Sequence, residues 1–380
     1  MERTKIGSKM EEFKAVWALG LMSGTSLDGI DAALVHTDGE RVSKIGPACM
    51  KPYSPAFREK LRGALGGKGE NEEISRELTE LHAEAVQELL TALPLSASPC
   101  AASDIAIIGF HGQTLLHEPK KHRTLQIGDG KLLAKLTGID VVNDFRSADI
   151  AAGGEGAPLA PLYHLARAEI LARPLAVLNL GGVANVTWIG DGNALLAFDT
   201  GPGNALLNDW MTLRTGDPYD CDGRLAMRGT VDDAILQRLM QNPYFWQRPP
   251  KSLDRNAFAI DALAGLSPED GAATLTAFTA ATVAMAGERH FPSPVERWFI
   301  TGGGRWNRAL MAALRQRLNV EVVPVEVAGW HGDVLEAEAF GFLAVRSLRG
   351  LPLSLPTTTG VHAPTPGGVL HRAEKAAEKA

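Results

Sequence analysis

The chain has 380 residues, of which 45% are apolar and 22% charged, so it is long enough to bury a substantial core and to form two domains. Its formal net charge of −6 is modest and both signs are spread along the sequence, which excludes a basic track for nucleic acid or for an anionic membrane. Cys49, Cys100 and Cys221 are few, odd in number and far apart, which argues against a disulfide framework and predicts a reducing compartment, the cytoplasm.

The two ends of the chain carry no targeting signal that we recognise. Residues 1–14 are charged rather than apolar, and no later segment has the roughly 18 uninterrupted apolar residues that a membrane span needs. Residues 356–380 mix Thr, Pro and Gly with a short run of Ala, Glu and Lys. We therefore expect no export and no membrane anchor, and we expect 1–14 and 356–380 to form flexible tails.

The first predicted element is a β-hairpin, with strands at 16–22 and 30–36 and a polar turn at 23–29. Backbone N–H groups freed by glycine, together with the hydroxyls of Ser23, Thr25 and Ser26, can converge on phosphate oxygens. An ordinary glycine turn has a similar composition, so both interpretations stay open at this point. An amphipathic helix, with leucines spaced by three and four residues, follows at 72–93.

The middle of the chain repeats this pattern. Apolar strands at 104–109 and 139–142 end in the polar groups His111-Gly112-Gln113-Thr114 and Asp144-Phe145-Arg146. After a glycine-rich bend and a helix at 164–171, a second hairpin follows, whose strands are predicted at 175–180, 183–189 and 194–198. The architecture is therefore predicted to be duplicated.

The last part of the chain supplies strand–loop–helix units. We expect helices at 271–290, 307–318 and 333–348 and a strand at 297–301. The predicted fold is α/β with two lobes and a ligand cleft between them. The first lobe is expected at 15–140 and the second at 141–332, with the helix 333–348 packing back on the first lobe.

Three loops of the second lobe are candidates for chemistry. The turn at Gly181-Gly182 can approach phosphates, or it can be a plain hairpin turn. Asp199 follows an apolar strand and precedes a helical stretch, so from its position it can be a helix cap or a base. Residues 301–304, Thr-Gly-Gly-Gly, precede a helix whose free N–H groups favour an anionic nucleotide, although a flexible connector has the same sequence.

Rival motifs are absent. The sequence has no P-loop, because Gly67-Lys68 lacks the following Ser or Thr, and no Gly-x-Gly-x-x-Gly follows a strand. Asp144-Phe145-Arg146 lacks the companion motifs of a protein kinase. His111 and His117 do not form a helical metal pair, because Pro119 interrupts any such helix, so we expect them to form hydrogen bonds.

At this point the residues resemble those of a known family, anhydro-N-acetylmuramic acid kinase, over most of residues 20–346. The matching blocks are Met22-Ser23-Gly24-Thr25-Ser26-Leu27-Asp28-Gly29, His111-Gly112-Gln113-Thr114, Asp144-Phe145-Arg146, Ala151-Ala152-Gly153-Gly154-Glu155-Gly156-Ala157-Pro158-Leu159, Asn179-Leu180-Gly181-Gly182 and Phe198-Asp199-Thr200-Gly201-Pro202-Gly203-Asn204. Several blocks in one order make the resemblance specific.

The resemblance implies the two-lobed actin-like ATPase (ribonuclease H-like) fold, with a duplicated βββαβα core and an interlobe cleft. It also implies a reaction in peptidoglycan recycling. Such enzymes open the 1,6-anhydro ring of 1,6-anhydro-N-acetylmuramic acid with water and transfer the γ-phosphoryl group of ATP to O6. The products are N-acetylmuramic acid 6-phosphate and ADP.

The resemblance also implies roles for individual residues. Asp199 would be the general base that activates water, and Arg146, Asp149 and Glu336 would contact the sugar. A structural ion pair for Arg146 and a solvated helix face for Glu336 are the alternatives. The residues expected to bind ATP are Gly24, Thr25, Ser26, Leu27, Asp28, Gly29, Ile30, Asp31, Gly181, Gly182, Thr301, Gly302, Gly303 and Gly304.

Mg²⁺ would be held mainly by ATP phosphates and water. Related hexokinase-like hairpins carry an Asp where this chain has Leu21 and Met22, so Asp28 is a candidate metal ligand. Two rival functions stay open: a kinase for another anhydrosugar such as levoglucosan, and a nucleotide-driven binding module of the same fold. The residues leave a homodimer open.

Overall fold

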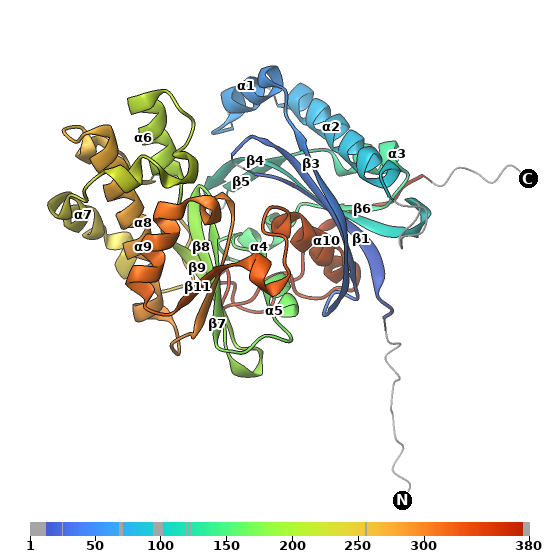
Figure 1. The fold of residues 1–380 in the computed structure, drawn as a ribbon. Coiled ribbons are helices and arrows are strands. Elements are labelled where there is room, and N and C mark those ends of the chain that lie inside the picture. The colour runs from blue at the N-terminus through green and yellow to red at the C-terminus, as the bar shows by residue number, and fades with distance from the viewer. Residues whose placement is uncertain are drawn as a thin grey trace, which may run out of the picture.

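The computed structural model describes residues 13–24, 26–67, 71–93, 102–118, 121, 123–254 and 257–374. Two β-sheets and the helices around them form two lobes (Figure 1). The strands are β1 (Val16–Ser23), β2 (Gly29–Thr37), β3 (Val42–Pro52), β4 (Ile105–Glu118), β5 (Arg123–Ile127), β6 (Val141–Asn143), β7 (Leu175–Leu180), β8 (Val183–Ile189), β9 (Leu195–Pro202), β10 (Arg297–Thr301), β11 (Glu321–Pro324) and β12 (Val369–His371).

Helices cover both sheets. They are α1 (Pro55–Ala64), α2 (Glu72–Thr91), α3 (Gly130–Thr137), α4 (Ser147–Ala151), α5 (Pro161–Arg167), α6 (Ala205–Thr215), α7 (Asp233–Met240), α8 (Pro268–His290), α9 (Arg308–Leu318) and α10 (Leu335–Leu348). In Figure 1, α8 and α9 lie on the outer side of the second sheet, and α2 and α3 lie on the outer side of the first.

The two sheets have the same topology. The first has the order β3-β2-β1-β4-β6 with β12 beyond β6, and the second has the order β9-β8-β7-β10-β11. In each, three strands form an antiparallel meander and two more join it in parallel. The predicted duplicated βββαβα core, and with it the two-lobed actin-like ATPase fold class, is confirmed.

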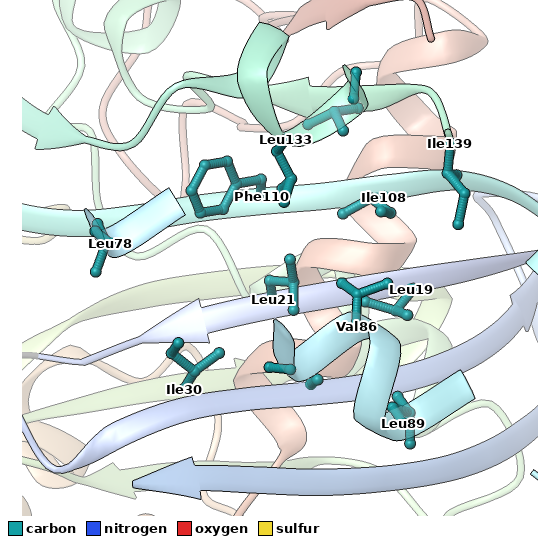
Figure 2. Packing of buried hydrophobic residues seen from close by; sticks show 14 of the residues in the cluster. Leu19, Leu21, Ile30, Leu78, Val86, Leu89, Ile108, Phe110, Leu133 and Ile139 are labelled. Atoms are coloured by element: carbon teal, nitrogen blue, oxygen red, sulfur yellow. The ribbon is translucent and has the colours of Figure 1, made fainter. Parts of the chain in front are cut away.

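The core of the first lobe lies between its sheet and α2 and α3. Leu19 and Leu21 of β1 are fully buried, as are Ile108 and Phe110 of β4 (Figure 2). Leu78, Val86 and Leu89 of α2 pack in the same cluster because they recur on one face of the helix (Figure 2). This packing fixes the strand ends that carry the candidate site.

Helix α10 packs on the other face of the first sheet, against β1, β2 and β4. The approach is close enough that a Cβ at Gly20 would overlap the carbonyl oxygen of Ala337, and a Cβ at Gly109 would overlap that of Phe340. At the far side of α10, Glu338 accepts hydrogen bonds from Tyr163 and, at 2.8 Å, from Arg167, both of α5. One helix therefore connects the two lobes.

Most predicted elements are present, with shifted ends. β10 has the predicted bounds, whereas β4 continues to Glu118 because it pairs with β5. Strand β3 was not predicted, because it is an edge strand with only intermediate and exposed positions and therefore shows no clear apolar alternation.

The expectation of a free tail at 356–380 is wrong for the described residues 356–374. β12 pairs with β6 in antiparallel register, Val361 is 1% exposed, and Thr359 donates a hydrogen bond to Asp149. Polar composition did not reveal this packing because it depends on an exposed sheet edge far away in the sequence. Residues 1–12 and 375–380 lie outside the described residues. In the described part, no helix has the length and apolarity needed to cross a membrane.

Candidate active site

Asp199 lies in β9 and is only 8% exposed. The pairing of β8 with β9 shifts register beside it, which is the local irregularity that re-aims side chains at a strand end. Its Oδ2 accepts the N–H of Leu253 at 2.8 Å. The following helix α6 has Asn204 as its N-cap, so Asp199 is not the cap of that helix and this alternative is excluded.

The electrostatic environment of Asp199 suits a base. Burial raises the pKa of Asp199 to about 7, and the Leu253 N–H acts in the opposite direction. Nearby Glu155 raises the pKa further, whereas Arg146 and Lys251 lower it. A carboxylate with a pKa close to neutrality can both lose and accept a proton under working conditions.

Arg146 lies just before α4 and is half-buried. Its guanidinium donates to His111 Nε2 at 2.9 Å and to the carbonyl oxygen of Gly156 at 2.6 Å. Burial, followed by the charge of Arg146, holds the pKa of His111 well below its usual value, so the imidazole is a neutral acceptor. The expected hydrogen-bonding role of His111 is therefore observed.

Arg146 also faces three carboxylates. Glu336, Asp149 and Asp199 each favour its charged form, against the effect of burial, which lowers the pKa of Arg146. None of them is an ion-pair partner of Arg146 in the described part of the chain. The guanidinium is therefore held by neutral groups and is surrounded by acidic side chains from three different segments.

Glu336 lies in the first turn of α10. Its Oε1 accepts a hydrogen bond from Asn179 Nδ2 of β7 at 3.2 Å, which joins the two lobes. The side chain is open to solvent, but protein surrounds it closely enough that desolvation raises its pKa, against the opposing effect of Arg146. A sugar contact by Glu336 stays a prediction, with an exposed helix face as the alternative.

Asp149 is 2% exposed and has both oxygens in use. Oδ1 accepts the N–H of Gly156 and Oδ2 accepts the hydroxyl of Thr359, each at 2.6 Å. These bonds hold the glycine-rich bend 153–156 and the C-terminal segment in place. A sugar contact by Asp149 stays a prediction, and its present partners give it a supporting place behind Arg146.

The first hairpin turn is short and exposed. Asp28 Oδ1 accepts the hydroxyl of Ser26 at 2.6 Å and the N–H of Gly29 at 3.1 Å. Leu27 adopts a φ of 56°, and its N–H donates to the carbonyl oxygen of Gly24 at 3.2 Å. Thr25, an expected phosphate contact, lies outside the described residues. Polar groups of this turn face solvent, while Leu27 is buried and anchors it.

The hairpin continues into Ile30 and Asp31. Ile30 is fully buried in the core, so only its backbone is available to a ligand. Burial raises the pKa of Asp31 to about 7, and the nearby carboxylates of Asp28, Glu336 and Asp333 raise it further. The hairpin of the first lobe thus meets the start of α10.

The turn at Gly181 and Gly182 contacts the segment between β9 and α6. The carbonyl oxygen of Gly181 accepts the N–H of Asn204 at 2.8 Å, and that of Gly182 accepts the N–H of Gly203 at 3.0 Å. A Cβ at Gly203 would overlap Gly181, so the two loops require glycine to approach this closely. Asp199 and the second turn are therefore positioned together.

Residues 301–304 pack beside the same turn. Thr301 donates to the carbonyl oxygen of Gly332 at 3.0 Å, and Gly302 has a φ of 75°. A Cβ at Gly302 would overlap Asn179 Oδ1 and come within 2.8 Å of Leu180. Gly303 is exposed with open space around it, and Gly304 is buried. A free connector would not pack this way. A 3₁₀ turn separates the loop from α9, whose N-cap is Asn307.

Predicted residues from the first hairpin, from the segment before α4 and from the start of α10 interact around Glu336. Asp31, Arg146 and Asn179 all lie near its carboxylate. The charge of Arg146 in turn acts on Asp199, and Gly302 packs closely against Asn179. The sequence analysis assigned no role to Asn179 or Glu155 as single residues, although both stand in blocks that carry the family resemblance.

Lys251 and Tyr244 were also missed. Tyr244 donates its hydroxyl to the carbonyl oxygen of Asp199 at 2.7 Å, and the N–H of Asp199 donates to the carbonyl oxygen of Lys251 at 3.0 Å. Neither residue belongs to a block that carries the resemblance, and neither stands in a periodic segment. The sequence held no signal for them.

No group of three or more metal-binding side chains converges anywhere in the described residues. Four acidic side chains gather near the hairpin, and the charges of Asp28, Glu336 and Asp333 add to burial in raising the pKa of Asp31. A divalent cation brought by phosphate oxygens would relieve this repulsion. The donor set therefore fits Mg²⁺ held mainly through a nucleotide and water, and does not fit a protein-only metal cage.

The chain is similar in sequence to one known family over almost its whole length. The family model described as anhydro-N-acetylmuramic acid kinase matches residues 16–373. A protein of Paramagnetospirillum magneticum with that name is 56% identical over 357 residues, which cover 93% of this chain and 99% of the relative. One of Rhodospirillum rubrum, also so named, is 55% identical over 360 residues, covering 93% and 94%.

Similarity to solved structures is distant. The (R)-2-hydroxyglutaryl-CoA dehydratase component A of Acidaminococcus fermentans aligns with a TM-score of 0.46 and 14% identity over 88% of this chain and 99% of that one. A ROK family glucokinase of Streptomyces griseus gives 0.38 and 14%, over 87% and 99%. At these values neither structure bears on the chemistry of this site.

Proposed function

Because the chain belongs to the anhydro-N-acetylmuramic acid kinase family, we propose that it opens the 1,6-anhydro ring of 1,6-anhydro-N-acetylmuramic acid and phosphorylates O6 at the expense of ATP. The products are N-acetylmuramic acid 6-phosphate and ADP. The observation that carries the proposal is a buried carboxylate, Asp199, whose pKa is raised to about 7 next to Arg146.

In the proposed reaction Asp199 takes a proton from water, whose oxygen attacks the anomeric carbon. The bond from that carbon to O6 breaks, and O6 attacks the γ-phosphorus as the bond to the ADP oxygen breaks. Proton abstraction needs a base with a pKa near the working pH, whereas phosphoryl transfer needs mainly positioning and neutralisation of charge. Arg146, held by His111 and Gly156, is suited to the second task.

We assign ATP to the loops of both lobes. The hairpin residues 24–31 would contact the phosphates from the first lobe, with Gly181 and Gly182 opposite and residues 301–304 near the adenosine. The close packing of Gly302 against Asn179 supports this, because Asn179 also binds Glu336 at the start of α10. Mg²⁺ would bridge the phosphate oxygens, neutralising their charge, with Asp28 as a candidate ligand.

Glu336 and Arg146 are our candidates for contacts with the sugar, since the charge of Arg146 interacts with that of Asp199 and the charge of Glu336 interacts with that of Asp31 in the hairpin. We place the reaction in the cytoplasm, in agreement with the few and scattered cysteines. Cys49 and Cys221 are free in the structure, and Cys100 lies outside the described residues. The chain can also act as a homodimer in this proposal.

Isotope labelling in ¹⁸O-water tests the reaction. With ATP and 1,6-anhydro-N-acetylmuramic acid, label should enter the anomeric hydroxyl of the product and not the phosphate, as measured by mass spectrometry. Label in released phosphate would show that water attacks phosphorus and would contradict the mechanism. Levoglucosan in parallel tests the substrate, and ADP release independent of any sugar would indicate a nucleotide-driven binding module.

A further inference from the structure

The segment 251–253 is hydrogen-bonded to Asp199. The N–H of Asp199 donates to the carbonyl oxygen of Lys251 at 3.0 Å, and the N–H of Leu253 donates to Asp199 Oδ2 at 2.8 Å. Between them, Ser252 donates its hydroxyl to Glu155 Oε2 at 2.5 Å. Three consecutive residues therefore contact Asp199 or the acidic side chain beside it.

Lys251 is the unusual member of this segment, because it is a lysine with only 5% exposure. Its Nζ donates to the carbonyl oxygen of Tyr244 at 3.0 Å and lies 4.5 Å from the centre of the Tyr244 ring and 5.8 Å from that of Phe198. No carboxylate forms an ion pair with it among the residues that the structure describes. A buried lysine without an ion pair is costly and requires a reason.

The contacts of Lys251 form a closed circuit around Asp199. Lys251 donates to the backbone of Tyr244, Tyr244 donates its hydroxyl to the backbone of Asp199, and Asp199 donates its N–H to the backbone of Lys251. Because Phe198 precedes Asp199 in β9, the ring contact of Lys251 with Phe198 holds the same strand. Movement of the ammonium group would therefore disturb the position of the carboxylate.

We propose that Lys251 is a positioning residue that holds the segment 251–253 against Asp199, and that its buried charge, together with that of Arg146, favours the ionised form of the Asp199 carboxylate. The inference rests on the proposed function in one respect, the role of Asp199 as base. It assigns a role to a residue outside every block that carries the family resemblance.

The charged groups around Asp199 and Lys251 agree with this assignment. Asp199 faces Glu155 and Arg146 from the segments on either side of α4 and Lys251 from the segment 251–253. Lys251 in turn faces Arg289 and His290 at the end of α8. Burial lowers the pKa of Lys251 to about 8, against the effect of Asp199, so the ammonium form is still present at neutral pH.

The pH dependence of kcat/KM tests the proposal. Lys251→Gln keeps a donor for the Tyr244 carbonyl but removes the charge, so the Asp199 carboxylate loses a stabilising cation. We expect the acid limb of the profile to move up by about 0.5 to 1 pH unit and kcat at pH 7 to fall several-fold, with little change in KM for ATP. Lys251→Arg, which keeps the charge, should restore the limb toward that of the wild type.

Two further variants separate position from charge. Tyr244→Phe breaks the circuit without altering any charge, so it should lower kcat and leave the acid limb in place. Lys251→Met replaces Lys251→Gln if the glutamine variant does not fold, as checked by circular dichroism and melting temperature. A folded neutral variant with the wild-type acid limb would overturn the proposal.

Failure of the proposed function gives a different result. If Asp199→Asn keeps near-normal turnover, Asp199 is not the base and the basis of the inference is lost. If Asp199→Asn is inactive and the folded neutral variants of Lys251 keep the wild-type profile, only the role of Lys251 is wrong.

Discussion

The surroundings of Asp199 and the first hairpin turn, which we propose to belong to the same site, are built in different ways. Asp199 is 8% exposed, and backbone groups of Leu253 and Lys251 and the hydroxyl of Tyr244 already form hydrogen bonds with it. The hairpin turn holds itself together through Ser26 and Asp28, which are both exposed. The proposed base is thus positioned before substrate arrives, whereas the proposed phosphate loop has polar groups still available to a ligand.

The difference has a physical reason. Proton transfer depends on the pKa of one group, and burial is the main means of raising that of a carboxylate. Binding of phosphate depends on several N–H and hydroxyl donors that must remain accessible until the nucleotide arrives. Changes around Asp199 should therefore affect turnover strongly, and changes in the turn should affect ATP binding moderately.

The largest expected effect is that of Asp199→Asn. The amide retains an oxygen for the Leu253 N–H but cannot take a proton from water, so turnover should fall by about 10² to 10⁴-fold. ATP binding, measured by calorimetry, should persist. Asp220→Asn is the matched control, because Asp220 is also buried and accepts backbone N–H groups of Leu225 and Ala226 but lies outside the proposed site. Equal losses in both variants would contradict a special role for Asp199.

The stability of Asp199→Asn should change with pH in a defined direction. Burial raises the pKa of Asp199 from 3.8 to about 7, so the folded protein retains a proton that the unfolded chain releases. This contribution to stability is complete below pH 3.8 and is lost as the pH rises to about 7. Asn has no such loss. The free energy of unfolding of the variant, relative to that of the wild type, should therefore rise by about 1 to 3 kcal/mol from pH 5 to pH 8.

Urea titrations at several pH values measure this difference. A constant difference between the two proteins over that range would mean that Asp199 is ionised in the folded protein at all these pH values. The comparison would then change, because the surroundings of Asp199 would not raise the pKa of its carboxylate.

The smallest expected effect lies in the hairpin turn. Ser26→Ala removes one exposed hydroxyl that is bonded to Asp28, so it should raise KM for ATP by about 3- to 10-fold and change kcat little. Ser26→Thr keeps the hydroxyl and is the matched control. Steady-state kinetics with varied ATP measures both. A large loss of kcat in Ser26→Ala would show that the turn takes part in the chemical step.

The sequence determined much of the fold. β1 is a continuous apolar run because both faces of its sheet are covered, the leucines of α2 recur on one face, and the glycine loops follow strands, so local sequence patterns were enough to place these elements and to reveal the duplication. The motif blocks also specified the family. These features are visible in sequence because they depend on neighbours within a few residues.

Tertiary structure alone decided what surrounds the reacting groups. From its position alone, Asp199 was equally a helix cap or a base, and the structure excluded the cap because Asn204 is the N-cap of α6. Lys251 lies 52 residues along the chain from Asp199 and reaches it only because the segment 251–253 folds over β9. The pKa of a buried group depends on such distant contacts and on exclusion of water, neither of which is a local property of the sequence.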